Sequence, residues 1–246
     1  MELKNKRVLV TGASSGIGAA TAVAFAQKGA IVLVHYRNND KGAEQTLAEV
    51  EKYSSGRIYQ ADLTERDQIK RMYAAISANY DSIDVLVNNA AEARPGELFD
   101  DDLWEYELKS IFLAALHTTE DFLKIESEAQ RKIINVTSVY GNINTSNPGL
   151  PQYSASKAAL CNLTASMAKK FGNKVLVNAV APGFTWTQVW ERAPEERRRQ
   201  VIGTTKIGRW IQSPEIAHAV IFLAENDAIT GQIITVDGGT SLVQIA

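Results

Sequence analysis

The chain has 246 residues, of which 45% are hydrophobic and 22% charged, and its formal net charge at pH 7 is −2. This composition is typical of a globular protein, and the near-neutral charge argues against nucleic acid or a membrane surface as the main partner. A single cysteine, Cys161, excludes an internal disulfide, and no ligand spacing indicates a metal site. The N-terminus has no long apolar segment, so we expect a cytoplasmic protein made of one domain over residues 1–246.

Strand-like apolar runs alternate with helix-like amphipathic segments along the chain. The strands are rich in Val, Ile and Leu without polar alternation, which suits parallel strands covered on both faces. The expected fold is α/β, a Rossmann-like, doubly wound parallel sheet of about seven strands. We predict strands at 7–11, 31–35, 57–60, 83–87, 132–137, 174–180 and 232–236, and helices at 16–28, 41–53, 65–79, 101–125 and 152–171.

The first predicted strand leads into a glycine-rich turn, Thr11-Gly12-Ala13-Ser14-Ser15-Gly16-Ile17-Gly18. A turn of this kind lets the backbone approach a pyrophosphate, which then meets the free N–H groups of the following helix. The alternative is a glycine-rich turn without a ligand, but the flanking strand and helix favour a dinucleotide site. The candidate binding residues in this turn are Gly12, Ser14, Ser15, Gly16, Ile17 and Gly18.

The end of the second predicted strand should distinguish NADP from NAD, because it lies near the adenosine ribose. An acidic residue there would bind the free ribose hydroxyl of NAD, yet the segment His35-Tyr36-Arg37-Asn38-Asn39 has no acid before Asp40. Arg37 could bind the phosphate of NADP through charge-assisted hydrogen bonds, or it could be an ordinary exposed arginine. We therefore expect NADP, with NAD as the alternative, and include Arg37 and Asn38 among the binding residues.

Tyr153 and Lys157 are the most informative pair in the chain. Their four-residue spacing places both side chains on one face of the helix predicted at 152–171. A nearby ammonium favours phenolate and would help a tyrosine, whose ordinary pKa is about 10, to exchange a proton near neutral pH. Taken alone, such a pair is more often two solvated neighbours on a helix surface.

Together these segments resemble the short-chain dehydrogenase/reductase family over essentially the whole chain, with the signals in the family's order. Asn88-Asn89-Ala90 follows the fourth predicted strand, Ser138 the fifth and Pro182-Gly183 the sixth, and Val236-Asp237-Gly238-Gly239 lies near the end. The resemblance implies hydride transfer between a nicotinamide cofactor and a carbonyl or alcohol. A small-molecule substrate is therefore the expected partner.

The resemblance also implies roles for individual residues. Tyr153 would exchange the proton with the substrate, Lys157 would lower the pKa of Tyr153 and hold the nicotinamide ribose, and Ser138 would bind the substrate oxygen. Asp62 would contact adenine, or could instead cap the next helix. The further cofactor contacts that the resemblance implies are Leu63, Asn89, Ala90, Pro182, Gly183 and Thr185, and Thr187 matches a family threonine on the same loop.

Two departures from the family pattern lie close to the predicted active site. Glu107 stands where the family has a proton-relay asparagine, and Ala91 replaces a glycine. A glutamate could hold a water near Lys157 or pair with it directly, which would weaken the effect of the ammonium on Tyr153. These two residues are the basis for a different hypothesis, a dinucleotide-binding protein without turnover, although the intact Ser138 argues against it.

The segment at 184–211 and nearby aromatic residues bear on the substrate. Residues 184–211 interrupt the strand–helix alternation and contain three tryptophans, so we predict a substrate lid, with a helix that packs on the domain as the alternative. The aromatic side chains of Tyr140, Trp186 and Trp190 suggest an aromatic pocket. The pattern is similar to oxoacyl carrier-protein reductases and to sugar dehydrogenases of the family. Carrier-protein binding would require a basic surface, to which Arg131 and Lys132 could contribute.

By resemblance we expect a homo-oligomer, a symmetric dimer or tetramer, with the helices at 101–125 and 152–171 at an interface. Three apolar residues of the second helix, Leu160, Leu163 and Met167, could pack there or simply face the sheet.

Overall fold

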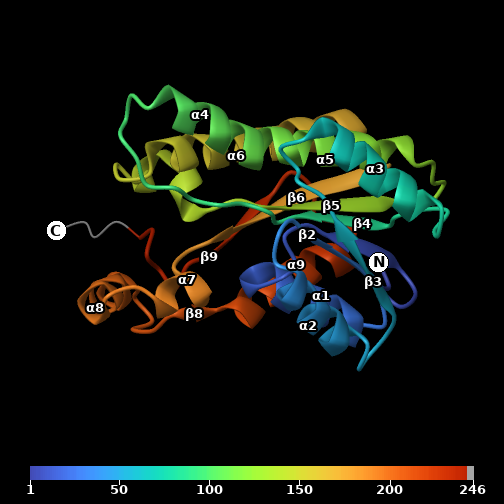
Figure 1. Ribbon diagram of the computed structural model, residues 1–246, viewed down its shortest axis with the longest axis horizontal. Coiled ribbons are helices and arrows are strands. Elements are labelled where there is room, and N and C mark those ends of the chain that lie inside the picture. Colours follow the sequence, from blue (N-terminus) through green and yellow to red (C-terminus); the bar gives the residue numbers. More distant parts are fainter. Residues whose placement is uncertain (243–246) are drawn as a thin grey trace.

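The structure, a computed structural model, describes residues 1–242 and is built on a parallel sheet (Figure 1). The strands of this sheet are β1 (Arg7–Val10), β2 (Ile31–Tyr36), β3 (Gly56–Gln60), β4 (Val85–Asn88), β5 (Arg131–Val136), β6 (Val175–Pro182) and β9 (Ile233–Val236). Their order across the sheet is β3-β2-β1-β4-β5-β6-β9, and every neighbouring pair is parallel. The predicted Rossmann-like α/β fold and its seven strands are therefore confirmed.

Helices cover both faces of the sheet, because each parallel strand pair needs a crossover connection. In Figure 1, α1 (Gly16–Gln27), α2 (Asp40–Val50) and α9 (Ser213–Glu225) lie on one face, and α3 (Arg66–Ser77), α5 (Ala114–Lys124) and α6 (Pro151–Phe171) lie on the other. Alternate strand residues point to the two faces. Val8 and Val10 pack with Phe25 of α1, whereas Leu9 packs on the opposite side with Phe122 of α5.

The helix predicted at 101–125 has three parts. It consists of α4 (Asp101–Glu107), a π-helical stretch η1 (Leu108–Leu113) and α5, and the backbone stays helical throughout. Stretches of π-helix are rare and frequently lie at functional sites. Here η1 follows Glu107 directly, and its Ser110 lines the cleft described below.

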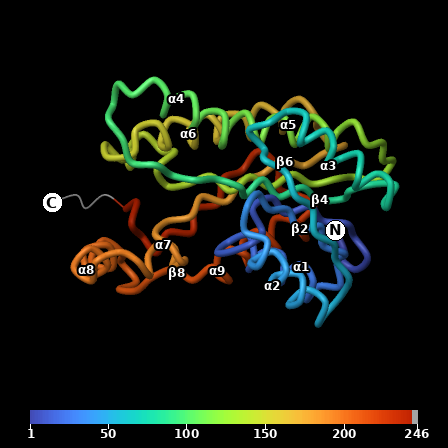
Figure 2. The backbone as a smooth tube through the Cα atoms, viewed as in Figure 1, coloured from blue at the N-terminus to red at the C-terminus, as the bar shows by residue number. Residues whose placement is uncertain are grey.

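The segment at 184–211 leaves the sheet and returns to it. It contains β7 (Thr185–Trp186), α7 (Gln188–Glu191) and α8 (Glu195–Thr204), and a short parallel pairing between β7 and β8 (Ile211–Gln212) joins its ends. In the tube view of Figure 2, α7 and α8 project to one side of the sheet. The rings of Trp190 and Trp210 lie 4.9 Å apart. The segment therefore projects from the sheet (Figure 2), and its tryptophans pack on one another.

The helix α9 begins at Ser213, and Gln212 is its N-cap. The backbone N–H of Gln212 donates to the Glu215 carboxylate at 2.8 Å, which satisfies a group that the helix leaves unpaired.

The basic surface expected at Arg131 and Lys132 was a wrong prediction. The Arg131 guanidinium is buried and donates to the carbonyl oxygens of Phe122 and Ile125 at 2.9 and 2.8 Å. The Lys132 ammonium is also buried and pairs with Asp227 at 2.6 Å. These residues start β5, a strand with both faces covered, so their charges are used inside the protein.

Among the apolar side chains of α6, Met167 packs with the strands of the sheet, whereas Leu160 packs with Ile111 of η1 and Ala115 of α5. Leu160 and Met167 are buried in the core, and Leu163 is partly buried against them. Within residues 1–242, no helix combines the length and the apolar character that a membrane span requires.

Candidate active site

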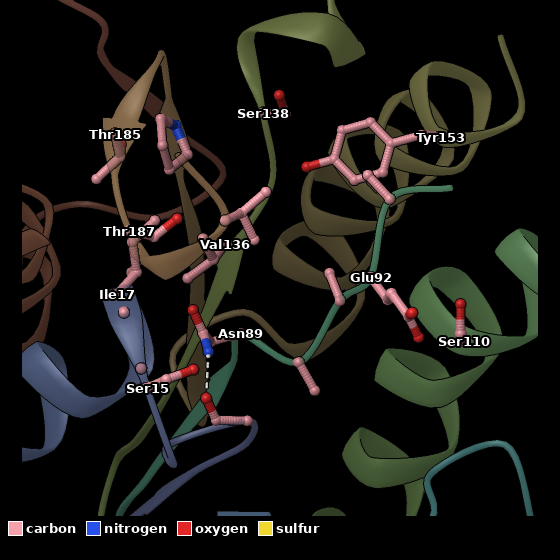
Figure 3. Close-up of a pocket in the computed structure, with 18 of the residues that line it drawn as sticks. Ser15, Ile17, Asn89, Glu92, Ser110, Val136, Ser138, Tyr153, Thr185 and Thr187 are labelled. Atoms are coloured by element: carbon pink, nitrogen blue, oxygen red, sulfur yellow. Dashed lines mark hydrogen bonds between the residues drawn. The ribbon is translucent and has the colours of Figure 1, made fainter. Parts of the chain in front are cut away.

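A single cleft of about 940 Å³ lies at the carboxyl ends of the strands and collects every residue predicted for the cofactor and for catalysis. Its size is in the range typical of small-molecule and cofactor sites. The crossover at β1 and β4, where the chain switches from one side of the sheet to the other, lies at its floor. Figure 3 shows Ser15 and Ile17 of the glycine turn on one side of this cleft and Tyr153 on the other.

The glycine turn forms a cradle that larger residues would fill. A Cβ atom on Gly12 would lie 2.8 Å from the Cα of Ala90, and one on Gly18 would lie 2.3 Å from the carbonyl oxygen of Gly12. The side-chain amide of Asn89 ties the turn to β4 by donating to the carbonyl oxygens of Thr11 and Gly12 at 2.8 and 3.1 Å. The turn is thus packed closely against Asn89 and Ala90, and its other side lines the cleft, where a pyrophosphate could bind.

His35 also fastens the glycine turn, and sequence reasoning missed it. Its Nδ1 accepts from the backbone N–H of Gly12 at 3.0 Å, and its Nε2 lies 3.0 Å from the carbonyl oxygen of Ala61. Burial lowers the pKa of His35 to about 4, so the ring is neutral at physiological pH and Nε2–H is the donor to Ala61. Only its position at the end of β2, beside the turn, could have indicated this role.

Arg37 and Asp62 both line the adenosine end of the cleft. The Arg37 guanidinium pairs with the Glu92 carboxylate at 3.1 Å and donates to the Tyr106 hydroxyl at 3.2 Å. The Asp62 carboxylate accepts from the backbone N–H of Thr64 at 2.9 Å and so holds the turn ahead of α3. Sequence reasoning did not pick out Glu92 or Tyr106, although Glu92 stands only three residues after Asn89.

Ser138, Tyr153 and Lys157 come together from two elements. Ser138 follows β5, and its hydroxyl accepts from the backbone N–H of Tyr140 at 3.1 Å. Tyr153 and Lys157 lie one turn apart on α6, and the Lys157 ammonium is 5.6 Å from the centre of the Tyr153 ring. In Figure 3 the hydroxyls of Ser138 and Tyr153 point into the same space. The predicted pair therefore faces the cleft and not solvent.

Burial dominates the electrostatics of this group. It raises the pKa of Tyr153 to about 12, an effect that the Ser138 hydroxyl partly offsets. It lowers the pKa of Lys157 to about 8, and the ammonium donates to the carbonyl oxygen of Val136 at 2.7 Å. In the protein alone, burial thus outweighs the expected lowering of the Tyr153 pKa by Lys157.

Aromatic side chains form one wall of the cleft. Tyr140, Phe184 and Trp190 all line it, and their rings meet edge to face at 6.0 and 5.8 Å. Trp186 lies outside the cleft lining and packs on Trp210 instead, with ring centres 5.3 Å apart. The predicted aromatic pocket is therefore present, with Phe184 in place of Trp186.

Below this wall the chain passes through Pro182, Gly183 and Thr185, which line the cleft as predicted, as does Thr187. A Cβ atom on Gly183 would lie 2.7 Å from the Cα of Asp237. A glycine at this position therefore has a packing cause in this chain, the close approach of the turn after β9.

A family model described as "Enoyl-(Acyl carrier protein) reductase" matches residues 12–241. The chain belongs to the short-chain dehydrogenase/reductase family. A 3-oxoacyl-[acyl-carrier-protein] reductase FabG of Thermotoga maritima is 37% identical over 97% of this chain and 99% of its own. Nodulation protein G of a Rhizobium species is 34% identical over 98% and 99%.

Two solved structures share the fold over nearly their whole length. The angucycline C-6 ketoreductase LanV with bound NADP has a TM-score of 0.91 and 28% identity, with 98% of each chain covered. A putative gluconate dehydrogenase from Agrobacterium tumefaciens has a TM-score of 0.92 and 25% identity, with 99% of this chain and 98% of its own covered. Like its family, this short-chain dehydrogenase/reductase is an NAD(P)-dependent oxidoreductase.

Glu107, at the place of the family's relay asparagine, is fully buried. One of its oxygens accepts from the backbone N–H of Arg94 at 2.8 Å, and the other has no partner within the described part of the chain. Burial raises the pKa of this carboxyl group, and the nearby Lys157 acts in the opposite direction. No direct Glu107–Lys157 ion pair forms between described residues, and the Lys157 ammonium donates to the carbonyl oxygen of Val136.

Ala91 is accommodated without strain. Among residues 1–242, Asn5 is the one residue other than glycine with a positive φ, so Ala91 has an ordinary backbone conformation. The turn after β4 does not need the glycine-only conformation that the family pattern suggested.

Proposed function

We propose that this short-chain dehydrogenase/reductase is an NADPH-dependent carbonyl reductase of the oxoacyl type. The observation that carries the proposal is the meeting of Ser138, Tyr153 and Lys157 at one end of a cleft whose other end is the glycine turn. The names of two relatives support it, since one is a 3-oxoacyl-[acyl-carrier-protein] reductase and another is a ketoreductase with bound NADP.

The cleft would hold NADPH in an extended form. The glycine turn, Gly12 to Gly18, binds the pyrophosphate, and Lys157 the nicotinamide ribose. At the adenosine end, Asn38, Asp62 and Leu63 surround the base, and Arg37 binds the ribose phosphate through charge-assisted hydrogen bonds. The remaining contacts come from Asn89, Ala90, Pro182, Gly183 and Thr185, which line the floor and the nicotinamide side.

In the reaction, the bound cofactor supplies the hydride to the carbonyl carbon. Ser138 donates a hydrogen bond to the carbonyl oxygen and stabilises the negative charge that develops there. Tyr153 gives its proton to the same oxygen, which completes the alcohol and leaves a phenolate. The positive charge of Lys157, one turn away, favours that phenolate and so acts against the effect of burial, which raises the pKa of Tyr153.

A sugar dehydrogenase is the second candidate. The aromatic wall of Tyr140, Phe184 and Trp190 could stack on the apolar face of a sugar, and the structural neighbour described as a putative gluconate dehydrogenase fits this reading. The burial of Arg131 and Lys132 removes the basic surface that had favoured a carrier protein. Both candidates would use the same catalytic residues, and we place the oxoacyl type first because the relatives with 37% and 36% identity are named 3-oxoacyl-[acyl-carrier-protein] reductases.

The test is the loss of reduced-nicotinamide absorbance with NADPH and with NADH over a panel of carbonyl compounds. The panel holds an oxoacyl thioester, vicinal diketones, quinones and aldoses, and sugar oxidation is run in the reverse direction. Turnover of the thioester with NADPH is expected, and faster turnover of aldoses would move the assignment to the sugar enzymes. Tyr153→Phe should lose nearly all turnover while its affinity for NADPH is retained. Wild-type turnover in Tyr153→Phe would overturn the mechanism.

We also propose that the lid is 184–211 and that the protein is a homo-oligomer. Phe222 of α9 and Ile233 of the edge strand β9 are 47% and 41% exposed, and an unpaired edge with apolar neighbours favours association. Light scattering of the purified protein gives its mass in solution, and a monomer would contradict the proposal. The expected cytoplasmic location is a separate point, and the free thiol of Cys161 fits a reducing compartment.

A further inference from the structure

Glu92 is the centre of a small charged cluster at the rim of the cleft. One of its carboxylate oxygens accepts three hydrogen bonds, from Arg37 at 3.1 Å, from Arg94 at 3.1 Å and from the Tyr106 hydroxyl at 2.6 Å. The hydrogen bond from Tyr106 has the largest effect on the pKa of Glu92. Together with those from Arg94 and Arg37, it lowers this pKa to about 2, although burial acts in the opposite direction. The carboxylate is therefore charged throughout the physiological range.

The contact between Arg37 and Glu92 crosses the sheet. Arg37 follows β2 and Glu92 follows β4, and β1 with its glycine turn lies between these strands. Both side chains line the cleft, and Figure 3 shows Glu92 on the far side from Ser15. The Glu92 carboxylate thus binds the same Arg37 guanidinium that the ribose phosphate of NADPH would bind.

We propose that Glu92 is a specificity-determining residue that competes with the cofactor's ribose phosphate for Arg37 and so limits the preference for NADPH over NADH. The inference rests on the proposed use of NADPH. When NADPH binds, the Arg37 guanidinium exchanges one anionic partner for another. NADH brings no phosphate, so Arg37 stays with Glu92 when NADH binds.

The release of Arg37 from Glu92 should cost little free energy, because the carboxylate has other donors. After Arg37 leaves, the Glu92 oxygen keeps its bonds to Arg94 and Tyr106. Arg94 is held separately, with its guanidinium 3.6 Å from the centre of the Tyr106 ring. The side chains of Arg37 and Glu92 are 37% and 44% exposed, and an ion pair of such exposure is weak. Arg37 can therefore leave both Glu92 and the Tyr106 hydroxyl while the Glu92 carboxylate stays bound by its two other donors.

The experiment measures dissociation constants for NADPH and NADH by titration of nicotinamide fluorescence, without turnover. Glu92→Gln keeps the shape and removes the charge, so we expect NADPH to bind about fivefold more tightly, the upper range for an exposed pair, and NADH to change little. In an Arg37→Ala background, Glu92→Gln should have a much smaller effect on NADPH, because there is no guanidinium left to compete for.

Glu120→Gln is the matched control. Glu120 forms an exposed ion pair with Arg66 at 3.0 Å on α5, away from the cleft lining, so the variant loses the same charge without touching the site. It should leave both dissociation constants unchanged. Equal tightening of NADPH and NADH in Glu92→Gln, or no tightening of NADPH, would overturn the competition.

Arg37→Ala separates this inference from the proposed cofactor. If Arg37→Ala loses NADPH affinity while Glu92→Gln changes nothing, the use of NADPH stands and only the competition fails. If Arg37→Ala leaves the ratio of NADPH to NADH affinity unchanged, Arg37 does not bind the phosphate and both proposals fall.

Discussion

The imidazole of His35 accepts a hydrogen bond from the backbone N–H of Gly12 at 3.0 Å, which fastens the glycine turn to the neighbouring strand. The same ring bridges to Ala61 at the end of β3 through its other nitrogen. A neutral histidine can make both contacts, whereas a protonated ring has no acceptor for the Gly12 N–H. The conformation of the cofactor site is therefore linked to the protonation of one buried side chain.

His35 should make stability depend on pH. Its pKa is about 4 in the folded protein and about 6.5 when unfolded, so between these values the unfolded chain binds a proton that the folded chain does not. The contribution of His35 to the free energy of unfolding is fully present above pH 6.5. It is lost as the pH falls toward 4, and the loss reaches about 3 kcal/mol. Urea unfolding at several pH values measures this, with His35→Asn as the non-titrating comparison. An equal pH slope in the two proteins would contradict the prediction.

Glu107 should influence the pH dependence of turnover. Its negative charge raises the pKa of the Lys157 ammonium and also that of Tyr153. Glu107→Gln keeps an oxygen that can accept from the Arg94 N–H but removes the charge, so we expect the alkaline limb of the kcat profile to move to lower pH. The profiles of the two proteins provide the measurement. Coincident alkaline limbs would show that the carboxylate does not act on these groups.

Gly18→Ala should damage the cofactor site. The new methyl group would lie 2.3 Å from the Gly12 carbonyl oxygen and 2.5 Å from the Asn89 amide nitrogen, so the turn must shift. We expect a loss of about 1–3 kcal/mol of stability and at least about tenfold weaker NADPH binding. Gly203→Ala is the control, because its methyl group would meet nothing within 4 Å on α8. Wild-type NADPH affinity in Gly18→Ala would show that the cradle is not needed.

Asn88→Ala should destabilise the fold without touching the cofactor. The Asn88 amide donates to Asn135 at 2.9 Å and accepts from the Thr118 hydroxyl at 2.7 Å, and all three groups are buried between the sheet and α5. Removing it leaves the side-chain oxygen of Asn135 without its donor, which costs about 1–3 kcal/mol, whereas the Thr118 hydroxyl can still donate to the carbonyl oxygen of Ala114 at 2.8 Å. Thermal or urea unfolding measures the loss. Asn144→Ala, at an exposed asparagine in the loop after β5, should change stability by less than about 0.5 kcal/mol.

The sequence alone was sufficient for the fold and for the motifs that line the cleft, but it did not point to His35, Glu92 or Tyr106. Strand positions follow from local apolar runs, and the boundaries differ from the prediction by one or two residues. Every cofactor and catalytic candidate lines the cleft, because parallel strands bring their carboxyl ends to one edge and the motifs stand at those ends. The Tyr153–Lys157 pair needed only the helical period to be placed on one face.

The partners of the charged side chains were decided by tertiary structure alone. Arg37 forms an ion pair with Glu92, which lies 55 residues later in the chain, and Lys132 forms one with Asp227 in the turn after α9. No local sequence pattern predicts either pair. Burial depends on which elements cover a strand, so the same packing that hides Arg131 also shifts the pKa values of Tyr153 and Lys157. Local sequence therefore determined where the elements and motifs lie, whereas long-range packing determined their contacts and charge states, because these depend on residues that the chain brings together only when it folds.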